Sequence, residues 1–141
     1  MKFLNEQGQE ISLKRAENLP GYEVTLAEDT VIDSAVNNPF FKGINVLQLP
    51  KKLKGFRDNP DLQKLLEPQQ FSTGIKLDLS ANEVAIFEPN EELVQNKKLL
   101  LVNRLFGCKE RIEPLFVNFG LKKVKLQRNM VIGTVVVISV E

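Results

Sequence analysis

The sequence predicts an all-β domain, a sandwich or barrel of short strands. Short apolar and β-branched segments recur along the chain, and turn-forming residues separate them. Hydrophobic residues make up 43% and charged residues 26% of the sequence, which is ordinary for a soluble globular protein. At 141 residues the chain is long enough for one core and short for two, so we expect a single domain over 1–141.

The first strands are predicted at Tyr22–Leu26 and Thr30–Ile32, on either side of the polar turn at 27–29. The clearest alternation is in residues 74–79, GIKLDL, where Ile75, Leu77 and Leu79 fall on one face. An alternation of period two indicates a half-buried strand.

The second half of the chain continues this pattern. Strands are predicted at 84–87, 99–106, 115–119, 124–126 and 131–140. Turn residues separate them, among them Pro89, Gly107 and Gly120. Regular spacing of short strands favours a barrel or sandwich over a mixed α/β fold.

A proline-rich stretch interrupts the strands, and we interpret residues 34–70 as a surface insertion. Asp58 or Asn59 can cap a short helix that has Pro60 in its first turn. An edge strand that completes the core is the alternative, built from Phe40, Phe41, Ile44, Val46, Leu47 and Leu49.

Two basic clusters are candidate contacts for a partner. In the insertion, cations lie beside aromatic residues, which suits an anionic partner; the candidate contact residues are Phe40, Phe41, Lys51, Lys52, Lys54, Phe56 and Arg57. Near the C-terminus, Lys123 and Lys125 are predicted to be the solvated face of a strand whose Val124 and Leu126 point inward.

Composition excludes several functions. The sequence has no histidine and one cysteine, Cys108, which removes histidine-based nucleophilic catalysis, cysteine zinc clusters and intrachain disulfides. A net charge of +1 argues against nucleic acid as a partner. The N-terminus lacks the apolar core of a signal peptide, and the apolar run 131–140 is too short to cross a membrane as a helix.

Three fragments, in order, resemble one family. They are LPGYEVTLAEDTVI at 19–32, STGIKLDLSANEVAIFEPNEEL at 72–93 and IEPLFVNFGLKKVKLQRNMVIGTVVVI at 112–138. Together they resemble the boxes of the trimeric dUTPases, the deoxycytidine triphosphate deaminases and the dUTPase-like domains of retroelements. The resemblance implies a dUTPase-like β-barrel, related to β-clip and jelly-roll folds, with one short helix in the insertion.

The chain departs from this family where the chemistry is done. The phosphate-binding box, which supplies Arg and Ser in the family, is replaced by Pro89-Asn90-Glu91-Glu92-Leu93. Two carboxylates facing phosphate would cost about 1–4 kcal/mol per close pair. The stretch between Asn103 and Asn118 has no Asp and no Tyr, so neither the usual general base nor the sugar-stacking aromatic is present. Glu110 and Glu113 are the remaining substitutes.

From these departures we expect a noncatalytic homotrimer and not an enzyme: a structural, virion- or capsid-associated protein of a phage or mobile element, in the cytoplasm or virion. No catalytic, cofactor-binding or metal-binding residue is assigned. The last strand is apolar on both faces, which suits a contact between subunits; the predicted contact residues are Val131, Ile132, Val135, Val136, Val137 and Ile138. Other structural proteins of an assembly are further candidate partners.

Two other functions stay open. One is a regulatory module that binds protein or nucleic acid through the basic loops. The other is a divergent dUTP or dCTP hydrolase that uses Glu23, Glu91 or Glu92 with a divalent metal. In that reading Glu23 replaces the Asp of the family's first box.

Overall fold

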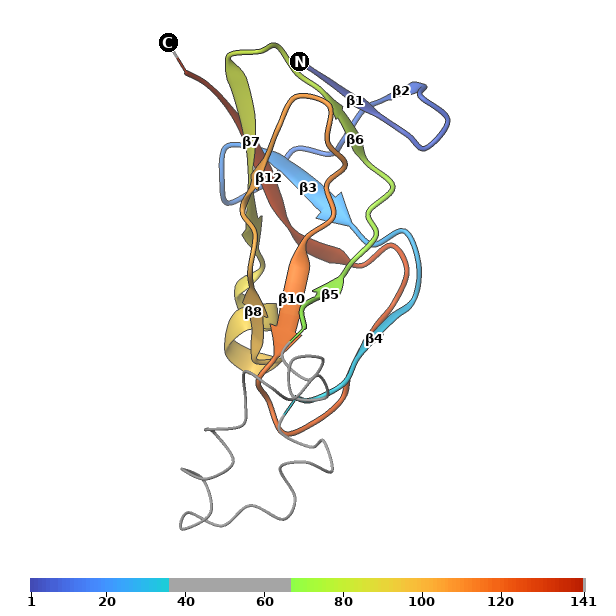
Figure 1. The fold of residues 1–141 in the computed structure, drawn as a ribbon, viewed down its shortest axis with the longest axis vertical. Helices are drawn as coiled ribbons and strands as arrows, with labels where there is room; N and C mark the ends of the chain where they lie inside the picture. The colour runs from blue at the N-terminus through green and yellow to red at the C-terminus, as the bar shows by residue number, and fades with distance from the viewer. Residues whose placement is uncertain (36–66, 141) are drawn as a thin grey trace, which may run out of the picture.

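A computed structural model describes residues 1–35 and 67–140. The strands are β1 (Lys2–Leu4), β2 (Glu10–Ile11), β3 (Tyr22–Thr25), β4 (Thr30–Ile32), β5 (Gln69–Gln70), β6 (Lys76–Asp78), β7 (Glu83–Pro89), β8 (Leu99–Leu101), β9 (Leu105–Phe106), β10 (Leu115–Asn118), β11 (Val124–Leu126) and β12 (Val131–Ser139). The prediction of an all-β fold is confirmed (Figure 1).

The strands of the described residues form four small sheets and not one closed barrel. The largest has the order β3-β12-β7-β9, and β12 pairs antiparallel with both β3 and β7. The others are β2-β1-β6, β5-β10-β8 and β11-β4. In Figure 1, β12 runs behind β3 through the middle of the molecule.

The core joins these sheets through aromatic side chains. Phe71, Phe87 and Phe116 are fully buried, and the ring of Phe116 lies 4.7 Å from that of Phe71 and 6.4 Å from that of Phe87, centroid to centroid. The residues predicted to alternate inward from β6, namely Ile75, Leu77 and Leu79, are all buried. Burial of large apolar side chains is the main stabilisation of a domain of this size.

A single helical turn, η2 (Glu92–Asn96), of π type, lies between β7 and β8. Leu93 is fully buried and anchors the turn to the core. Its backbone N–H donates to the carbonyl of Asn90 at 3.1 Å. We did not expect a helix here from the sequence.

The predicted strand 99–106 is wrong in one respect, because it breaks into β8 and β9. Asn103 lies at the break, and its Oδ1 accepts a hydrogen bond from the Leu115 N–H at 2.7 Å. Its Nδ2 donates to the carbonyl of Glu113 at 3.4 Å. At the break, the Asn103 side chain thus bonds to the backbone at the start of β10.

Most of the predicted insertion at 34–70 lies outside the described residues, with its short helix, the alternative edge strand, and the candidate contacts Phe40, Phe41, Lys51, Lys52, Lys54, Phe56 and Arg57. Its last residues are part of a sheet, since Gln69 and Gln70 of β5 pair with Phe116 and Leu115 of β10.

On β11, Val124 and Leu126 are buried and Lys125 is exposed, as predicted. Within the described residues, no helix is long and apolar enough to span a membrane.

Candidate functional site

An acidic cavity of about 990 Å³ lies where the N-terminal segment meets the ends of β7 and β12. We call it the acidic cavity. It is lined by Ala16, Glu17, Asn18, Leu19, Glu23, Glu88, Pro89, Asn90, Glu91, Glu92, Val131 and Thr134. Five of these residues are glutamates, and no Lys or Arg of the described residues lines it. Residues 89–92, which stand where the dUTPase family has its phosphate-binding box, therefore line a cavity of the fold.

The strand register brings two of these carboxylates to one sheet face. Thr134 on β12 lies opposite Glu23 on β3 and opposite Glu88 on β7. Residues directly opposite each other in antiparallel strands project to the same side of the sheet. The three side chains thus form one row at the wall of the acidic cavity.

Thr134 is unusual among the buried polar residues. It is only 8% exposed, and its hydroxyl has no hydrogen-bond partner among the described residues. Every fully enclosed side-chain nitrogen or oxygen in that part of the chain has a partner, so the Thr134 hydroxyl keeps its contact with the cavity that it lines. The other buried polar residues all bond within the chain: Thr30, Ser34, Thr73 and Asn118.

Among the described residues, two of the five glutamates have an ion-pair partner and three have none. Glu88 Oε2 lies 2.7 Å from Arg104 Nη1, and Glu23 Oε1 lies 3.9 Å from Lys14 Nζ. Within residues 1–35 and 67–140, no cation lies within ion-pair distance of the other three, Glu17, Glu91 and Glu92. The cavity therefore has an excess of negative charge.

Asn90 is committed to structure. Its Nδ2 donates to the Val131 carbonyl at 2.9 Å, and its backbone N–H donates to the Ile132 carbonyl at 2.9 Å. These bonds fix the start of the η2 turn against β12. The adjacent Glu91 and Glu92 are thereby held at the mouth of the cavity.

The carboxylates do not converge on a point. Among the described residues, no group of three or more His, Cys, Asp or Glu side chains is placed to hold a metal ion. The divalent metal invoked for a hydrolase reading therefore finds no ready set of ligands in this arrangement.

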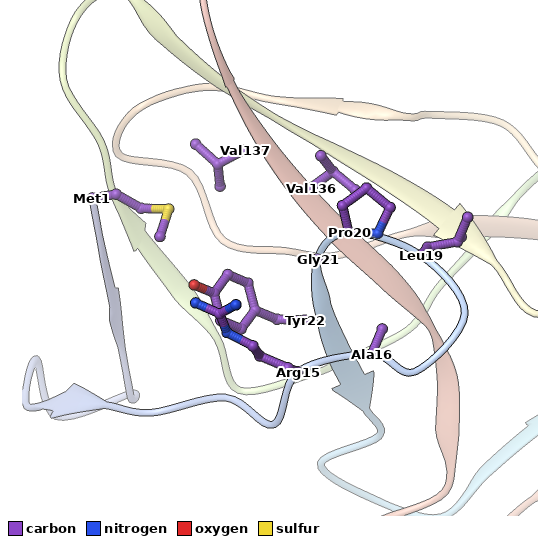
Figure 2. Close-up of a pocket in the computed structure, with 9 residues that line it drawn as sticks. All are labelled: Met1, Arg15, Ala16, Leu19, Pro20, Gly21, Tyr22, Val136 and Val137. Carbon is purple, nitrogen blue, oxygen red and sulfur yellow. The ribbon is translucent and has the colours of Figure 1, made fainter.

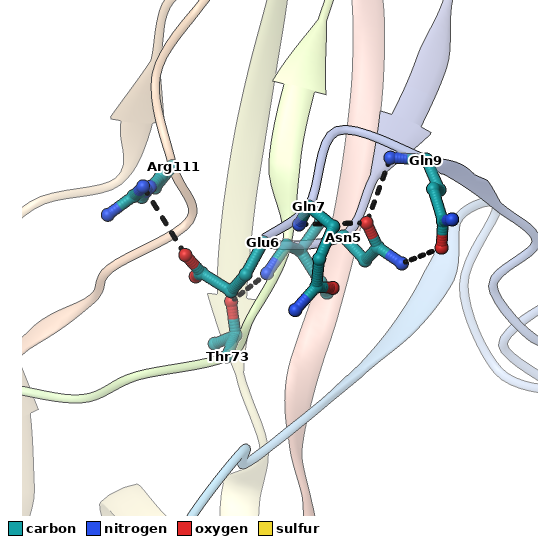
Figure 3. Close-up of polar contacts among 7 residues, drawn as sticks. Asn5, Glu6, Gln7, Gln9, Thr73 and Arg111 are labelled. Atoms are coloured by element: carbon teal, nitrogen blue, oxygen red, sulfur yellow. Dashed lines mark hydrogen bonds and ion pairs between the residues drawn. The ribbon is translucent and has the colours of Figure 1, made fainter.

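The substitute carboxylates Glu110 and Glu113 lie elsewhere. They line a separate cavity of about 490 Å³ with Gln70, Asn103, Phe106, Arg111 and Leu115. The segment that carries them is tied down: Arg111 Nη2 lies 3.3 Å from Glu6 Oε2, as Figure 3 shows, and Lys109 Nζ lies 3.8 Å from Asp78 Oδ1. Neither carboxylate lines the acidic cavity, so the two sets do not form one site.

A third cavity, of about 360 Å³, is also lined by residues of the 16–21 segment (Figure 2). Val136 and Val137 of β12 line it, with Leu19, Pro20 and Tyr22. Figure 2 shows the side chains of Arg15 and Tyr22 side by side at its edge. Gly21 is required here, because a Cβ on it would lie 2.5 Å from the carbonyl oxygen of Val135.

The predicted subunit-contact residues of β12 divide by burial. Ile132 and Val135 are fully buried in the core of the single chain. Val131, Val136 and Val137 are partly exposed, and Ile138 is 41% exposed. The sequence predicts a contact for the whole apolar run, because a strand buried on both faces has the same apolar pattern as a strand with one face free for a partner.

The fold is that of the dUTPases. No protein-family model and no curated protein matches the sequence. Among solved structures, the chain is similar to the dUTPase from Streptococcus mutans, with 15% identity, a TM-score of 0.65, and coverage of 100% of this chain and 97% of that one. It is also similar to the native EIAV dUTPase, with 10% identity, a TM-score of 0.62, and coverage of 99% and 88%.

A dUTPase of Staphylococcus bacteriophage 80alpha shares the same fold. Its identity is 9%, its TM-score is 0.63, and the match covers 98% of this chain and 83% of that one. The predicted dUTPase-like fold is confirmed by these comparisons.

The prediction that the chain is not an enzyme is contradicted. The solved structures that share its fold over its whole length are dUTPases, which are enzymes. The departures at Glu91 and Glu92 and between Asn103 and Asn118 are real, but no finding shows that catalysis is lost. Missing motif residues are weak evidence against activity because unrelated side chains can supply the same acid–base chemistry from other positions.

Proposed function

We propose that the chain is a self-assembling protein of the dUTPase fold, a homotrimer that serves as a structural or virion-associated component of a phage or mobile element. The observation that carries the proposal is an exposed apolar face on the largest sheet. The setting is supported by the phage dUTPases among the proteins of similar fold. The trimer is the arrangement that the resemblance to trimeric dUTPases implies.

This outer apolar face consists of Val84, Ile86, Leu105, Val136 and Ile138. Val136 lies opposite Ile86, which lies opposite Leu105, and Ile138 lies opposite Val84. The intervening residues point inward and are buried, among them Ala85 and Phe87. The five side chains thus share the outward side of β12, β7 and β9.

These side chains are poorly covered by the chain itself. Leu105 is 63% and Ile138 41% exposed, and Val84, Ile86 and Val136 are partly exposed. A solvent-facing sheet normally alternates apolar and polar residues, and a contiguous exposed apolar patch marks an interaction site. Val136 and Ile138 belong to the contact predicted from the sequence, and the other three extend it onto β7 and β9.

The test is the mass in solution by light scattering at micromolar concentration. We expect the mass of three chains for the unchanged protein and a shift toward the single chain for Leu105→Lys and Ile138→Lys. Val31→Lys is the matched control, since Val31 is 45% exposed but lies on β4 in another sheet. A single-chain mass for the unchanged protein, or lysine variants that stay trimeric, would refute the proposal.

Hydrolysis of dUTP or dCTP is a second candidate function. It is favoured by one observation, that Glu23, Glu91 and Glu92 all line the same cavity. The fold shared with dUTPases supports it. In this candidate function Glu23 is the general base, because β3 holds its carboxylate at the wall of the cavity.

Its test is release of pyrophosphate from dUTP and from dCTP by the purified protein. Hydrolysis by the unchanged protein and its loss in Glu23→Gln would support the activity. Glu113→Gln, in the separate cavity, is the control and should retain it. No pyrophosphate above the rate of a buffer blank would exclude this candidate.

A further inference from the structure

We infer that the acidic cavity is a binding site for an organic cation that carries two or more ammonium groups on a short apolar chain. The inference concerns what the cavity holds, and it does not depend on the oligomeric state or on hydrolysis. Its evidence is the charge of the cavity, the unpartnered Thr134 hydroxyl and the apolar residues between the carboxylates.

The negative charge of the acidic cavity requires a positively charged ligand. Five glutamates line the cavity and three of them, Glu17, Glu91 and Glu92, have no ion pair within the described residues. Carboxylates that share a cavity repel each other and repel any anion, and a cation relieves this repulsion. More than one unpaired carboxylate calls for more than one positive group.

The Thr134 hydroxyl points to a hydrogen-bonding ligand. The Thr134 residue is 8% exposed and lines the cavity, and its hydroxyl has no hydrogen-bond partner among the described residues. Because no enclosed side-chain oxygen of those residues is unpaired, this hydroxyl faces the cavity, where it is available to a ligand. An ammonium group can donate to this hydroxyl and to the neighbouring Glu23 and Glu88 carboxylates at once, because it has three donors.

The arrangement favours an organic cation over a metal ion. No three acidic side chains of the described residues are placed around one point as a metal would require. The same cavity is lined by Ala16, Leu19, Pro89 and Val131, which offer apolar contact to methylene groups. Linear amines carry their charges at intervals along such methylene chains and can follow separated carboxylates.

The experiment is calorimetric titration with spermidine and with a short lysine-containing peptide, each in low salt and without nucleotide. These two probes separate a free polyamine from lysine side chains of a polypeptide as the source of the ammonium groups. We expect saturable binding of at least one of them, weakened by added salt because the contact is ionic. Absence of heat for both, or binding of magnesium chloride alone, would overturn the inference.

Matched variants place the binding in the cavity. Thr134→Val keeps the shape and removes the hydroxyl, and we expect an affinity about fivefold to tenfold weaker. Glu91→Gln combined with Glu92→Gln should weaken it by at least about tenfold. Glu113→Gln should leave it unchanged, and equal affinity in all of these variants would sink the proposal. Because no hydrolysis is measured, this result stands apart from the pyrophosphate assay.

Discussion

At the scale of single residues, Gly133 shows how closely the central strands approach. A Cβ at this position would lie 2.4 Å from the carbonyl oxygen of Glu88 and 2.6 Å from Cζ of Phe87. Neither neighbour can yield easily, since one is strand backbone and the other is a fully buried ring. The glycine is therefore required for close approach of β12 to β7.

Gly133→Ala should lower the free energy of unfolding by about 1–3 kcal/mol through overpacking. Urea denaturation measures it. Gly107→Ala is the control, because a Cβ there would meet only the end of the Glu110 side chain. Equal stability of the two variants would show that β12 and β7 can separate without loss.

Glu83 gives the fold a dependence on pH. Its pKa is lowered from the ordinary value of 4.5, mainly because the Ser80 backbone N–H donates to its carboxylate at 2.8 Å. A lowered pKa in the folded state stabilises the fold at pH values above 4.5, and that stabilisation is lost as pH falls through the folded-state pKa. The stabilisation therefore comes from the ionised Glu83 carboxylate.

Glu83→Gln should therefore be less stable than the unchanged protein at pH 7. The difference in free energy of unfolding should shrink as pH falls below 4.5, where the unchanged protein also loses the charge. Urea titrations at pH 7 and pH 3 compare the two. A difference that stays constant over this range would show that the hydrogen bond does not depend on charge.

At the scale of elements, the first strand is integral to the fold although the sequence did not predict it. Phe3 is 5% exposed, and its ring meets that of Tyr22 edge-on with centroids 5.2 Å apart. β1 also pairs with β6, where Phe3 lies opposite Leu77. The N-terminal residues thus cover part of the core.

Phe3→Ala should cost about 3–5 kcal/mol of the free energy of unfolding, the usual cost of truncating a buried aromatic. Thermal melting followed by circular dichroism measures it. Lys2→Ala, which alters an exposed neighbour in the same strand, is the control and should melt near the unchanged protein. A small effect of Phe3→Ala would mean that β1 is peripheral.

The strands that sequence reasoning predicted are those in which apolar residues alternate or run together. The alternation at 75–79 identified β6, and the apolar runs identified β7, β10 and β12. β5 was missed because Gln69 and Gln70 carry no apolar signal, and their pairing is set by their partner β10. Tertiary context decides such short strands.

The acidic cavity was predictable only in part. The resemblance placed Glu23, Glu91 and Glu92 at a site, but the contributions of Glu88 and Thr134 follow from strand register. Glu17 lines the cavity from outside the strands, and no sequence pattern indicated it. Register is a property of pairing between distant segments, and it cannot be obtained from one segment alone. Of the five residues of the outer apolar face, only Val136 and Ile138 were named from the sequence, for the same reason.

At the scale of the whole molecule, β12 holds the largest sheet together. It lies between β3 and β7, and it pairs with β3 between Val131 and Val135 and with β7 between Gly133 and Ser139. No other described strand joins these two. Loss of β12 would leave backbone N–H and C=O groups of β3 and β7 without hydrogen-bond partners, which costs free energy wherever they stay buried.

A chain that ends at residue 130 should therefore fail to fold. We expect the β signal in circular dichroism and the cooperative urea transition both to disappear. The control is a chain that ends at residue 139, which keeps all of β12 and should fold. A cooperative transition in the shorter chain would show that β7 and β3 find other partners.

The contacts of the two chain ends have a practical consequence. The Met1 amino group lies 3.9 Å from Glu83 Oε1, and the Val140 N–H donates to the Asn82 carbonyl at 2.6 Å, so Met1 and Val140 both contact the turn before β7. Figure 1 shows the N and C labels at the same end of the molecule. A short peptide could splice them together, and the polypeptide could then be opened at an exposed turn elsewhere. Circularly permuted versions of this protein should thus be accessible to engineering.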